Sequence, residues 1–229
     1  KTDIKYLKTV GEKRAKLLNK MGIFTVGDLL RNYPRDYLDW SCVSTIAAAP
    51  FDENCCVRAF VDHKPVGAKI RNGLTIYKTV ATDGESLMNI TIFNNKYAAE
   101  SLCAGCEYLF YGKVSGNFHR REMTSPLIAP IADADKIQPI YRQTAGINSR
   151  YIERLVKQVY SSGGCELTDC IPIDVREKLC LPEVNKAIHT LHFPENYDML
   201  AEARRRMIFE ELFVFRTGLM LMRGSRQKT

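Results

Sequence analysis

The chain has 229 residues, a length that allows one or two domains, each with its own hydrophobic core. Hydrophobic residues make up 45% and charged residues 26%, as in soluble globular proteins, and no run of eighteen apolar residues predicts a membrane-spanning helix. The net charge of +7 is concentrated near the ends, +4 in residues 1–40 and +5 in residues 204–229, which is compatible with a nucleic-acid partner but does not require one.

The first predicted elements are short helices within residues 4–38, with Thr25 as a helix N-cap. This segment resembles a helix-hairpin-helix unit, in which backbone N–H groups of the hairpin bind a DNA phosphate. The usual Gly-x-Gly of that hairpin is Thr9-Val10-Gly11 here, so one glycine is missing. We expect Lys13 and Arg14 to supply positive charge to bound DNA. The alternative is a small helical packing unit.

The middle of the chain changes character and predicts a β-rich domain. Strands are predicted at Cys56–Val66, Leu74–Thr82, Met88–Phe93, Glu107–Ser115 and Glu122–Leu127, separated by turns at Asn72-Gly73, Asp83-Gly84 and Gly116-Asn117. A short helix is predicted at Lys96–Leu102, between the third and fourth strands. Three strands, a helix and two more strands is the element order of an OB-fold, a small Greek-key barrel.

The third predicted strand carries an aromatic residue on its polar face. Met88, Ile90 and Ile92 alternate with polar residues, so Phe93 falls in the polar set. Tyr97 follows four residues later, with Lys96 between the two aromatics. An aromatic pair outside the buried face, beside a cation, is suited to stacking on unpaired bases. The alternative is that both rings pack under the helix that follows.

Basic residues fall in the two loops that OB-folds use, together with the face of strands 2 and 3, to bind ligands. The predicted DNA-binding cations are Lys64, Lys69 and Arg71 in the first loop, and His119, Arg120 and Arg121 in the second. This placement favours binding of single strands. The alternative is that these loops are charged only because they are solvated.

The C-terminal part is predicted to be helical. Helices are expected at residues 146–162, 179–192 and 199–223, and Pro182 marks the start of the second. A linker-like Ser161-Ser162-Gly163-Gly164 ends the first helix, and His192-Phe193-Pro194 ends the second. His189 and His192 are expected to be core or interface residues. No phosphate-binding loop, nucleophile elbow or zinc-protease motif occurs, so nothing predicts catalysis by this chain alone.

The eight cysteines are irregularly spaced, which predicts reduced thiols and not a disulfide framework. Cys103 and Cys106 form the only Cys-x-x-Cys, and no second ligand pair at suitable spacing predicts a zinc site, so we expect no metal. The N-terminus lacks a secretory pattern, which favours a cytoplasmic protein. Because the sequence begins at Lys1 and its last predicted helix has no stop signal, we expect a fragment of a longer protein.

Several segments together resemble one family, the bacterial RecG helicases, which act on branched DNA. The matching segments are Val10–Leu30 with Tyr33-Pro-Arg-Asp-Tyr37, then Ile92-Phe-Asn-Asn-Lys-Tyr97, Leu181-Pro with Ala187-Ile-His-Thr-Leu-His-Phe-Pro194, and Ala203-Arg-Arg-Arg-Met-Ile-Phe-Glu-Glu-Leu212. The resemblance covers nearly the whole chain and implies an N-terminal region with an OB-fold wedge, ahead of ATP-dependent motor domains that this chain lacks. Phe93 and Tyr97 match the family's stacking aromatics.

The resemblance implies an α+β fold in three parts: helix-hairpin-helix-like residues 1–50, an OB-fold wedge at residues 51–145, and a helical region at residues 146–229 that leads to the motor. It implies binding to stalled replication forks or Holliday junctions in DNA repair and recombination. ATP and Mg²⁺ are implied for the parent enzyme only, in a bacterial, nucleoid-associated and monomeric protein. The alternative is an OB-fold interaction module that docks a single-strand-binding protein or the motor domains.

Overall fold

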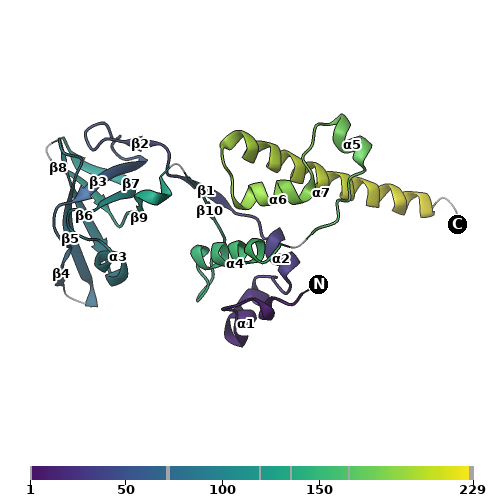
Figure 1. Cartoon of the computed structure of the whole chain (residues 1–229), viewed down its shortest axis with the longest axis horizontal. Coiled ribbons are helices and arrows are strands. Elements are labelled where there is room, and N and C mark those ends of the chain that lie inside the picture. Colours follow the sequence, from purple (N-terminus) through teal and green to yellow (C-terminus); the bar gives the residue numbers. More distant parts are fainter. Residues whose placement is uncertain (1, 71–72, 119, 135, 165, 227–229) are drawn as a thin grey trace. The chain divides into compact units, whose positions relative to one another are not determined.

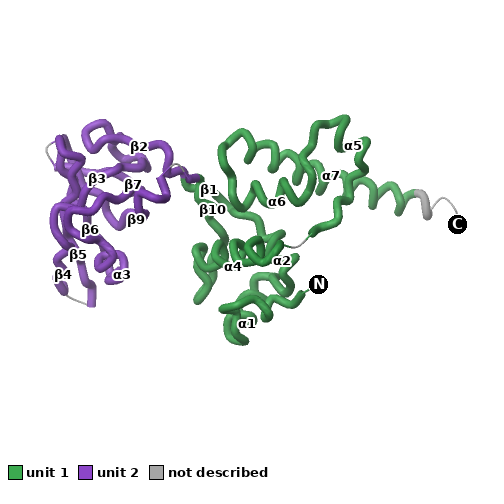
Figure 2. The backbone as a smooth tube through the Cα atoms, in the orientation of Figure 1, with its two compact units in different colours: residues 1–38, 137–229 green, residues 39–136 purple. Residues whose placement is uncertain are grey.

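The computed structural model describes residues 2–70, 73–118, 120–134, 136–164 and 166–226, which form two compact units. Figure 2 shows residues 39–136 as one unit, and residues 1–38 with residues 137–229 as the other. We call them the barrel unit and the helical unit. The short strands β1 (Asp36–Asp39) and β10 (Ile137–Ile140) pair with each other where the chain passes between the units.

The barrel unit contains a closed five-stranded barrel (Figure 1). Its strands are β3 (Asn54–Val61), β5 (Thr75–Thr82), β6 (Leu87–Phe93), β7 (Glu107–Asn117) and β8 (Arg120–Thr124). They pair in the order β3–β5–β6–β8–β7, and β7 pairs back onto β3 to close the barrel. The β6–β8 pairing is parallel and the others around the barrel are antiparallel. With helix α3 (Lys96–Glu100) between β6 and β7, this is the OB-fold that the sequence predicted.

Three short strands extend this barrel. β2 (Val43–Ser44) pairs in parallel with β3, and β9 (Leu127–Pro130), which precedes the 3₁₀ helix η3 (Ile131–Asp133), pairs with β7. β4 (Val66–Lys69) pairs antiparallel with the first half of β5, so the connection between the first two barrel strands is itself a hairpin.

The barrel core follows the predicted period-2 pattern. Alternate residues of β3 and β6 point inward and are buried, among them Val57, Ala59 and Val61 of β3 and Met88, Ile90 and Ile92 of β6. Gly67 of β4 lies opposite Tyr77, and a Cβ there would meet the Tyr77 ring at 2.7 Å, so the ring requires a glycine beside it. The strand predicted at Cys56–Val66 ends earlier than expected, at Val61.

The helical unit has its own core, formed by both ends of the chain. Its elements are η1 (Ile4–Tyr6), α1 (Glu12–Lys20), α2 (Val26–Arg31), α4 (Ser149–Ser161), α5 (Ile173–Lys178), α6 (Val184–His192) and α7 (Tyr197–Arg226). Thr25 caps α2 as predicted, in a capping box with Asp28. Leu18, Leu29, Ile152, Ile188 and Leu200 are among the buried residues of this shared core.

Two features of the helical unit differ from the sequence-based expectation. Residues 1–50 and 146–229 were predicted as separate parts, but their apolar faces bury one another in a single core, and the barrel unit begins at residue 39. Residues 179–192 were predicted to be helical with Pro182 marking the start, but α6 begins at Val184, where Glu183 accepts hydrogen bonds from the first-turn N–H groups. None of the described helices is long and apolar enough to cross a membrane.

Thr9 has the backbone conformation expected of the glycine that the hairpin sequence lacks. Its φ is +74°, in the left-handed region that glycine adopts without strain. Two hydrogen bonds hold its carbonyl, one from Tyr151 Oη at 3.0 Å and one from Arg14 Nη1 at 3.1 Å. Contacts with α4 and with α1 itself therefore hold Thr9 in this conformation.

Candidate nucleic-acid interface

Strands β4, β5 and β6 present an outward face that is partly apolar. In the register of these strands, Ala68, Ile76 and Phe93 lie side by side in one row across the sheet. Val66 and Lys78 lie in the next row on the same side, because residues two apart in a strand share a face. We call these five residues the outer face.

A turn fixed by two asparagines follows Phe93. Asn94 adopts a φ of +50°, which asparagine tolerates better than most residues, and its N–H donates to the Thr75 carbonyl at 2.8 Å. The Asn94 side chain accepts from the Thr75 N–H, also at 2.8 Å. Asn95 caps α3 by accepting from the Ala98 N–H at 3.1 Å. The sequence Phe-Asn-Asn-Lys-Tyr thus encodes a rigid strand-to-helix turn with an aromatic residue at each end.

Both aromatics at this turn are exposed. Phe93 has 39% of its surface accessible, and Tyr97 has 88%. The alternative prediction, that both rings pack under the following helix, is therefore wrong. Ala99 and Leu102 fill that space instead and are buried in the barrel core. Exposed aromatics on rigid backbone, next to the apolar outer face, are a surface suited to stacking on flat ligands.

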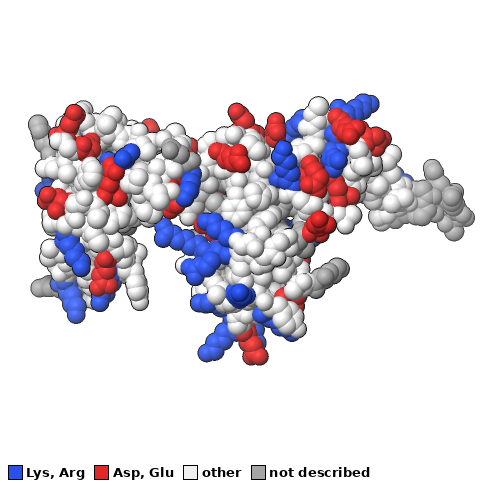
Figure 3. Space-filling model, in the orientation of Figure 1, with Lys and Arg blue, Asp and Glu red and all other residues white. Residues whose placement is uncertain are grey.

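The cations predicted near the first loop lie at this end of the barrel unit. Lys64 and Lys69 are exposed, and Lys69 pairs in register with Thr75, which is hydrogen-bonded to Asn94. Lys96 is exposed and lies 3.5 Å from Glu100, an exposed pair that contributes little to stability. Figure 3 shows Lys and Arg side chains gathered on the barrel unit around the position of β4, with acidic side chains among them. Arg71 lies outside the described residues.

Sequence reasoning missed one cation of this site. Lys78 is exposed in β5, directly opposite Thr91 of β6, and so lies on the outer face one row from Phe93. The signal was present, because Lys78 follows Ile76 at the spacing of one strand face. The prediction did not include Lys78 because it considered loop cations, and Lys78 lies within a strand.

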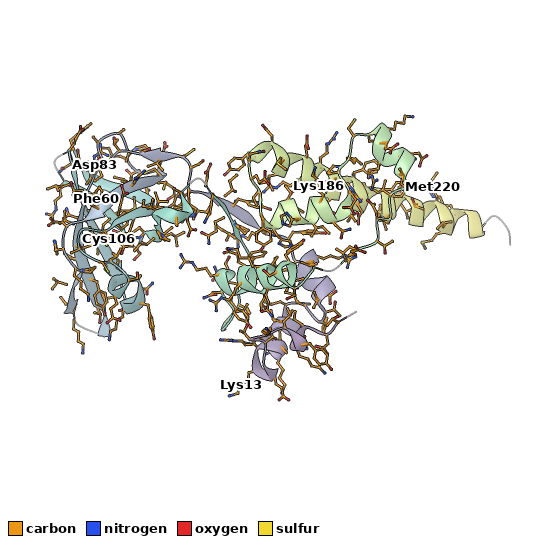
Figure 4. The ribbon with its side chains drawn as sticks, viewed as in Figure 1. Lys13, Phe60, Asp83, Cys106, Lys186 and Met220 are labelled. Atoms are coloured by element: carbon orange, nitrogen blue, oxygen red, sulfur yellow. The ribbon has the colours of Figure 1, made fainter. Side chains whose placement is uncertain are left out.

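The second loop, between β7 and β8, lies at the other end of β6. Arg121 is in register with Met88, at the start of β6, whereas Phe93 ends that strand. The connection between β5 and β6 is at this end too, and Figure 4 labels Asp83 there. Arg120 is exposed in this region, and His119 lies outside the described residues. The predicted loop cations are therefore divided between two ends of the barrel.

The expectation for Arg121 needs a correction. Its side chain is buried, and its guanidinium donates to the carbonyls of Ala49 and Ala47, both at 2.6 Å. The guanidinium also lies 4.4 Å from the centre of the Phe51 ring. The Arg121 side chain is inaccessible because it is directed at these carbonyls, in the segment before β3, and not at solvent. We therefore leave it out of the set of DNA-binding cations.

The remaining predicted cations belong to the helical unit. Lys13 is exposed at the start of α1, where Figure 4 labels it. Arg14 lies over the Tyr151 ring at 4.7 Å and lines a polar cleft of about 400 Å³ together with Arg154. No acidic residue is among those lining this cleft within the described chain. Its chemistry suits an anion such as a phosphate.

One group of described side chains has the composition of a metal site, but its charges are already balanced. Asp169, Cys170 and Glu210 have ligand atoms within 4.8 Å of one another. The buried Arg206 guanidinium donates to Asp169 and to Glu210, each at 2.6 Å. Burial raises the pKa of Asp169, but hydrogen bonds from the Ile171 N–H, Arg206 and Arg176, together with the charge of Arg206, bring this pKa below its usual value. We interpret this group as a structural ion network.

Comparisons with known proteins agree on one family. The sequence model of the RecG wedge domain matches residues 3–162. The chain is 31% identical to the ATP-dependent DNA helicase RecG of Thermotoga maritima and 27% identical to that of Bacillus subtilis, each over 99% of its length. A solved structure of RecG bound to a three-way DNA junction has a TM-score of 0.81 and 31% identity over 99% of the chain. The chain spans about a third of the length of these relatives, 30% and 33% of the two helicases and 32% of the solved structure.

Proposed function

This chain belongs to the RecG wedge-domain family, and from that premise we propose that it binds the branch point of forked or Holliday-type DNA within a helicase. Its role is to hold bases that have come out of the duplex where the arms part. The observation that carries this proposal is the pair of exposed aromatics, Phe93 and Tyr97, at the two ends of a turn fixed by Asn94 and Asn95.

The energetics assign this surface a passive role. Separating one base-pair step costs about 1.4 kcal/mol in lost stacking. Stacking an unpaired base on an aromatic side chain returns about 1–3 kcal/mol. Phe93 and Tyr97 therefore trap bases that are already open, but they cannot drive unwinding through successive base pairs. An external source of free energy has to move the duplex.

We assign that source to the rest of the parent protein. The relatives are named ATP-dependent DNA helicases and are about three times as long as this chain. ATP and Mg²⁺ belong to their remaining two thirds in this proposal, and the chain alone is expected to hydrolyse no ATP. The parent would act in DNA repair and recombination, in the bacterial cytoplasm where the nucleoid lies.

Cations supply affinity that is independent of base sequence. Lys64, Lys69 and Lys78 lie on the barrel unit near the aromatic pair, and Arg120 lies at the other end of β6. In the helical unit, Lys13 and the cleft lined by Arg14 offer contacts to backbone phosphates. Binding through such contacts weakens steeply as salt rises, because bound phosphates release counterions. In this proposal the shape of the junction provides the selectivity.

The proposal is tested by fluorescence anisotropy of labelled fork DNA and of plain duplex across a salt series. We expect Phe93→Ala and Tyr97→Ala to weaken fork binding about fivefold or more and to leave duplex binding nearly unchanged, from about 1 kcal/mol or more per lost stack. Phe60→Ala and Tyr6→Ala are matched controls, because Phe60 is 44% and Tyr6 72% exposed away from the outer face. Equal losses on fork and duplex would contradict the proposal.

The same titration distinguishes DNA binding from the alternative function, the docking of a protein partner. Absence of fork binding by the folded wild-type chain, even at low salt, would contradict DNA binding by this chain and would favour an OB-fold that docks a protein, such as a single-strand-binding protein or the motor domains. A steep salt dependence on the fork supports the DNA-binding role.

A further inference from the structure

Phe118 is a third exposed aromatic of the barrel unit. It lies in the loop between β7 and β8, and 82% of its surface is accessible. Its neighbours in that loop are polar, Asn117 before it and the exposed Arg120 after it. A phenylalanine this exposed gains little from folding, since apolar side chains stabilise a fold by leaving water. A binding role would account for a large apolar ring at this loop.

The Phe118 ring contacts a half-buried phenylalanine, Phe51, and a buried arginine, Arg121. Phe51 contacts it edge-on, with ring centres 5.7 Å apart and planes inclined by 68°. The Arg121 guanidinium lies 5.8 Å from its centre and 4.4 Å from the centre of the Phe51 ring. Arg121 is itself anchored by its hydrogen bonds to the carbonyls of Ala47 and Ala49. A ring held this way loses less conformational entropy when a ligand stacks on it.

The register of the barrel separates this ring from the first aromatic pair. Arg121 is opposite Met88, and Phe93 lies five residues further along β6. At about 3.3 Å per residue, the two places are roughly 17 Å apart along the strand. One unpaired base cannot contact both. The barrel therefore carries two separate aromatic surfaces, one at each end of β6.

We propose that Phe118 is a second base-stacking surface, which holds an unpaired base of the DNA strand other than the one held at Phe93 and Tyr97. This inference rests on the proposed function and extends it from one strand of the opened fork to both. A wedge with a stacking surface for each strand hinders re-annealing from both sides.

The chemistry around the ring favours a nucleobase over a protein. The accessible apolar surface in the loop is about one ring, far below the roughly 800 Å² per partner of a stable protein interface. Charge favours a polyanion, because the exposed Arg120 lies two residues after Phe118, and the acidic Asp52, which follows Phe51, is paired with Lys113 at 3.2 Å. An aromatic face beside cations is the usual arrangement for sequence-independent binding of single strands.

The test uses fork DNA that carries 5-iodo-deoxyuridine at one unpaired position next to the branch, placed in either strand in separate samples. After ultraviolet cross-linking to the whole chain, mass spectrometry identifies the attached peptide. We expect one strand to cross-link to Phe93 or Tyr97 and the other to Phe118. Cross-links of both strands to the same residues, or none to Phe118, would overturn the inference.

Binding measurements on Phe118 variants test the same inference without depending on the yield of cross-linking. Phe118→Ala is expected to weaken fork binding about fivefold or more, with duplex binding unchanged, whereas Phe118→Tyr retains the affinity. Leu127→Ala is the matched control, because Leu127 is an exposed apolar residue of β9. A Phe118→Ala variant that binds like Leu127→Ala, with intact circular dichroism, would overturn the inference. If cross-links form to Phe118 but none form to Phe93 or Tyr97, the proposed role of that pair is overturned, whereas base stacking on Phe118 is still supported.

Discussion

Acidification should destabilise the helical unit through one buried histidine. His192 is fully buried, its Nε2 lies 2.9 Å from the Leu30 carbonyl, and its Nδ1 lies 2.8 Å from Tyr141 Oη. A carbonyl only accepts, so Nε2 carries the proton and Nδ1 accepts from the tyrosine. This neutral tautomer joins α6 to the end of α2 and to residue 141. Protonation would place a charge in a dry site and disrupt the bond from Tyr141.

The expected size follows from the pKa difference between the folded and unfolded states. Burial lowers the pKa of His192 from 6.5 to about 4. In the unfolded chain, His192 therefore binds a proton as the pH falls below 6.5, whereas in the folded chain it does so only near pH 4. Stability from the neutral histidine is complete above pH 6.5 and is lost as the pH falls through this range. Between pH 7.5 and pH 5, the loss amounts to about 2 kcal/mol in the free energy of unfolding.

Urea unfolding at the two pH values measures this loss, with two probes for the two units. Circular dichroism at 222 nm reports mainly on the helical unit, and the fluorescence of Trp40, the single tryptophan, reports on the barrel unit. We expect the loss in the helical signal of the wild type and of His189→Gln, whose histidine is exposed on the same helix. It should largely disappear in His192→Gln. An equal pH-dependent loss in His192→Gln would refute the assignment to His192.

Two further substitutions test other parts of the structure. Arg206→Met should destabilise the helical unit by about 3–5 kcal/mol, because it leaves the carboxylates of Asp169 and Glu210 without their buried partner. The circular-dichroism midpoint should fall while the Trp40 midpoint stays, and a fall in both would contradict two independent units. Lys78→Gln should lower the slope of log affinity against log salt by about 1 on any DNA that reaches the outer face. Lys186→Gln, an exposed lysine of α6, serves as its control, and equal slopes in all three proteins would remove Lys78 from the interface.

The strand pattern was sufficient to predict the barrel and its exposed aromatic. Phe93 is out of phase with Met88, Ile90 and Ile92, and period-2 geometry places it outside without knowledge of the rest of the fold. The order of strands around the short helix then identified the OB-fold. These inferences succeeded because they depend on local alternation and on connection order, both of which are written directly in the sequence.

Long-range polar contacts limited the rest of the prediction. Arg121 looked like a loop cation, but its environment depends on the carbonyls of residues 47 and 49, more than 70 positions away. In the same way, His192 and Arg206 lie in segments that identified the family by resemblance, and the structure shows their physical roles. His192 binds Leu30 across 162 positions, and Arg206 binds Asp169 across 37. The local periodicity of a sequence does not predict hydrogen-bond partners that lie so far apart in the chain.

The central claim is that bases at the branch point stack on Phe93 and Tyr97. A fork with 2-aminopurine at the first unpaired position tests it directly, because the fluorescence of this base responds to stacking. We predict that saturating wild-type chain changes the emission of the probe in one strand, and that Phe93→Ala and Tyr97→Ala remove most of this change at concentrations that still saturate the fork. The same change in emission with both variants as with the wild type would contradict the claim.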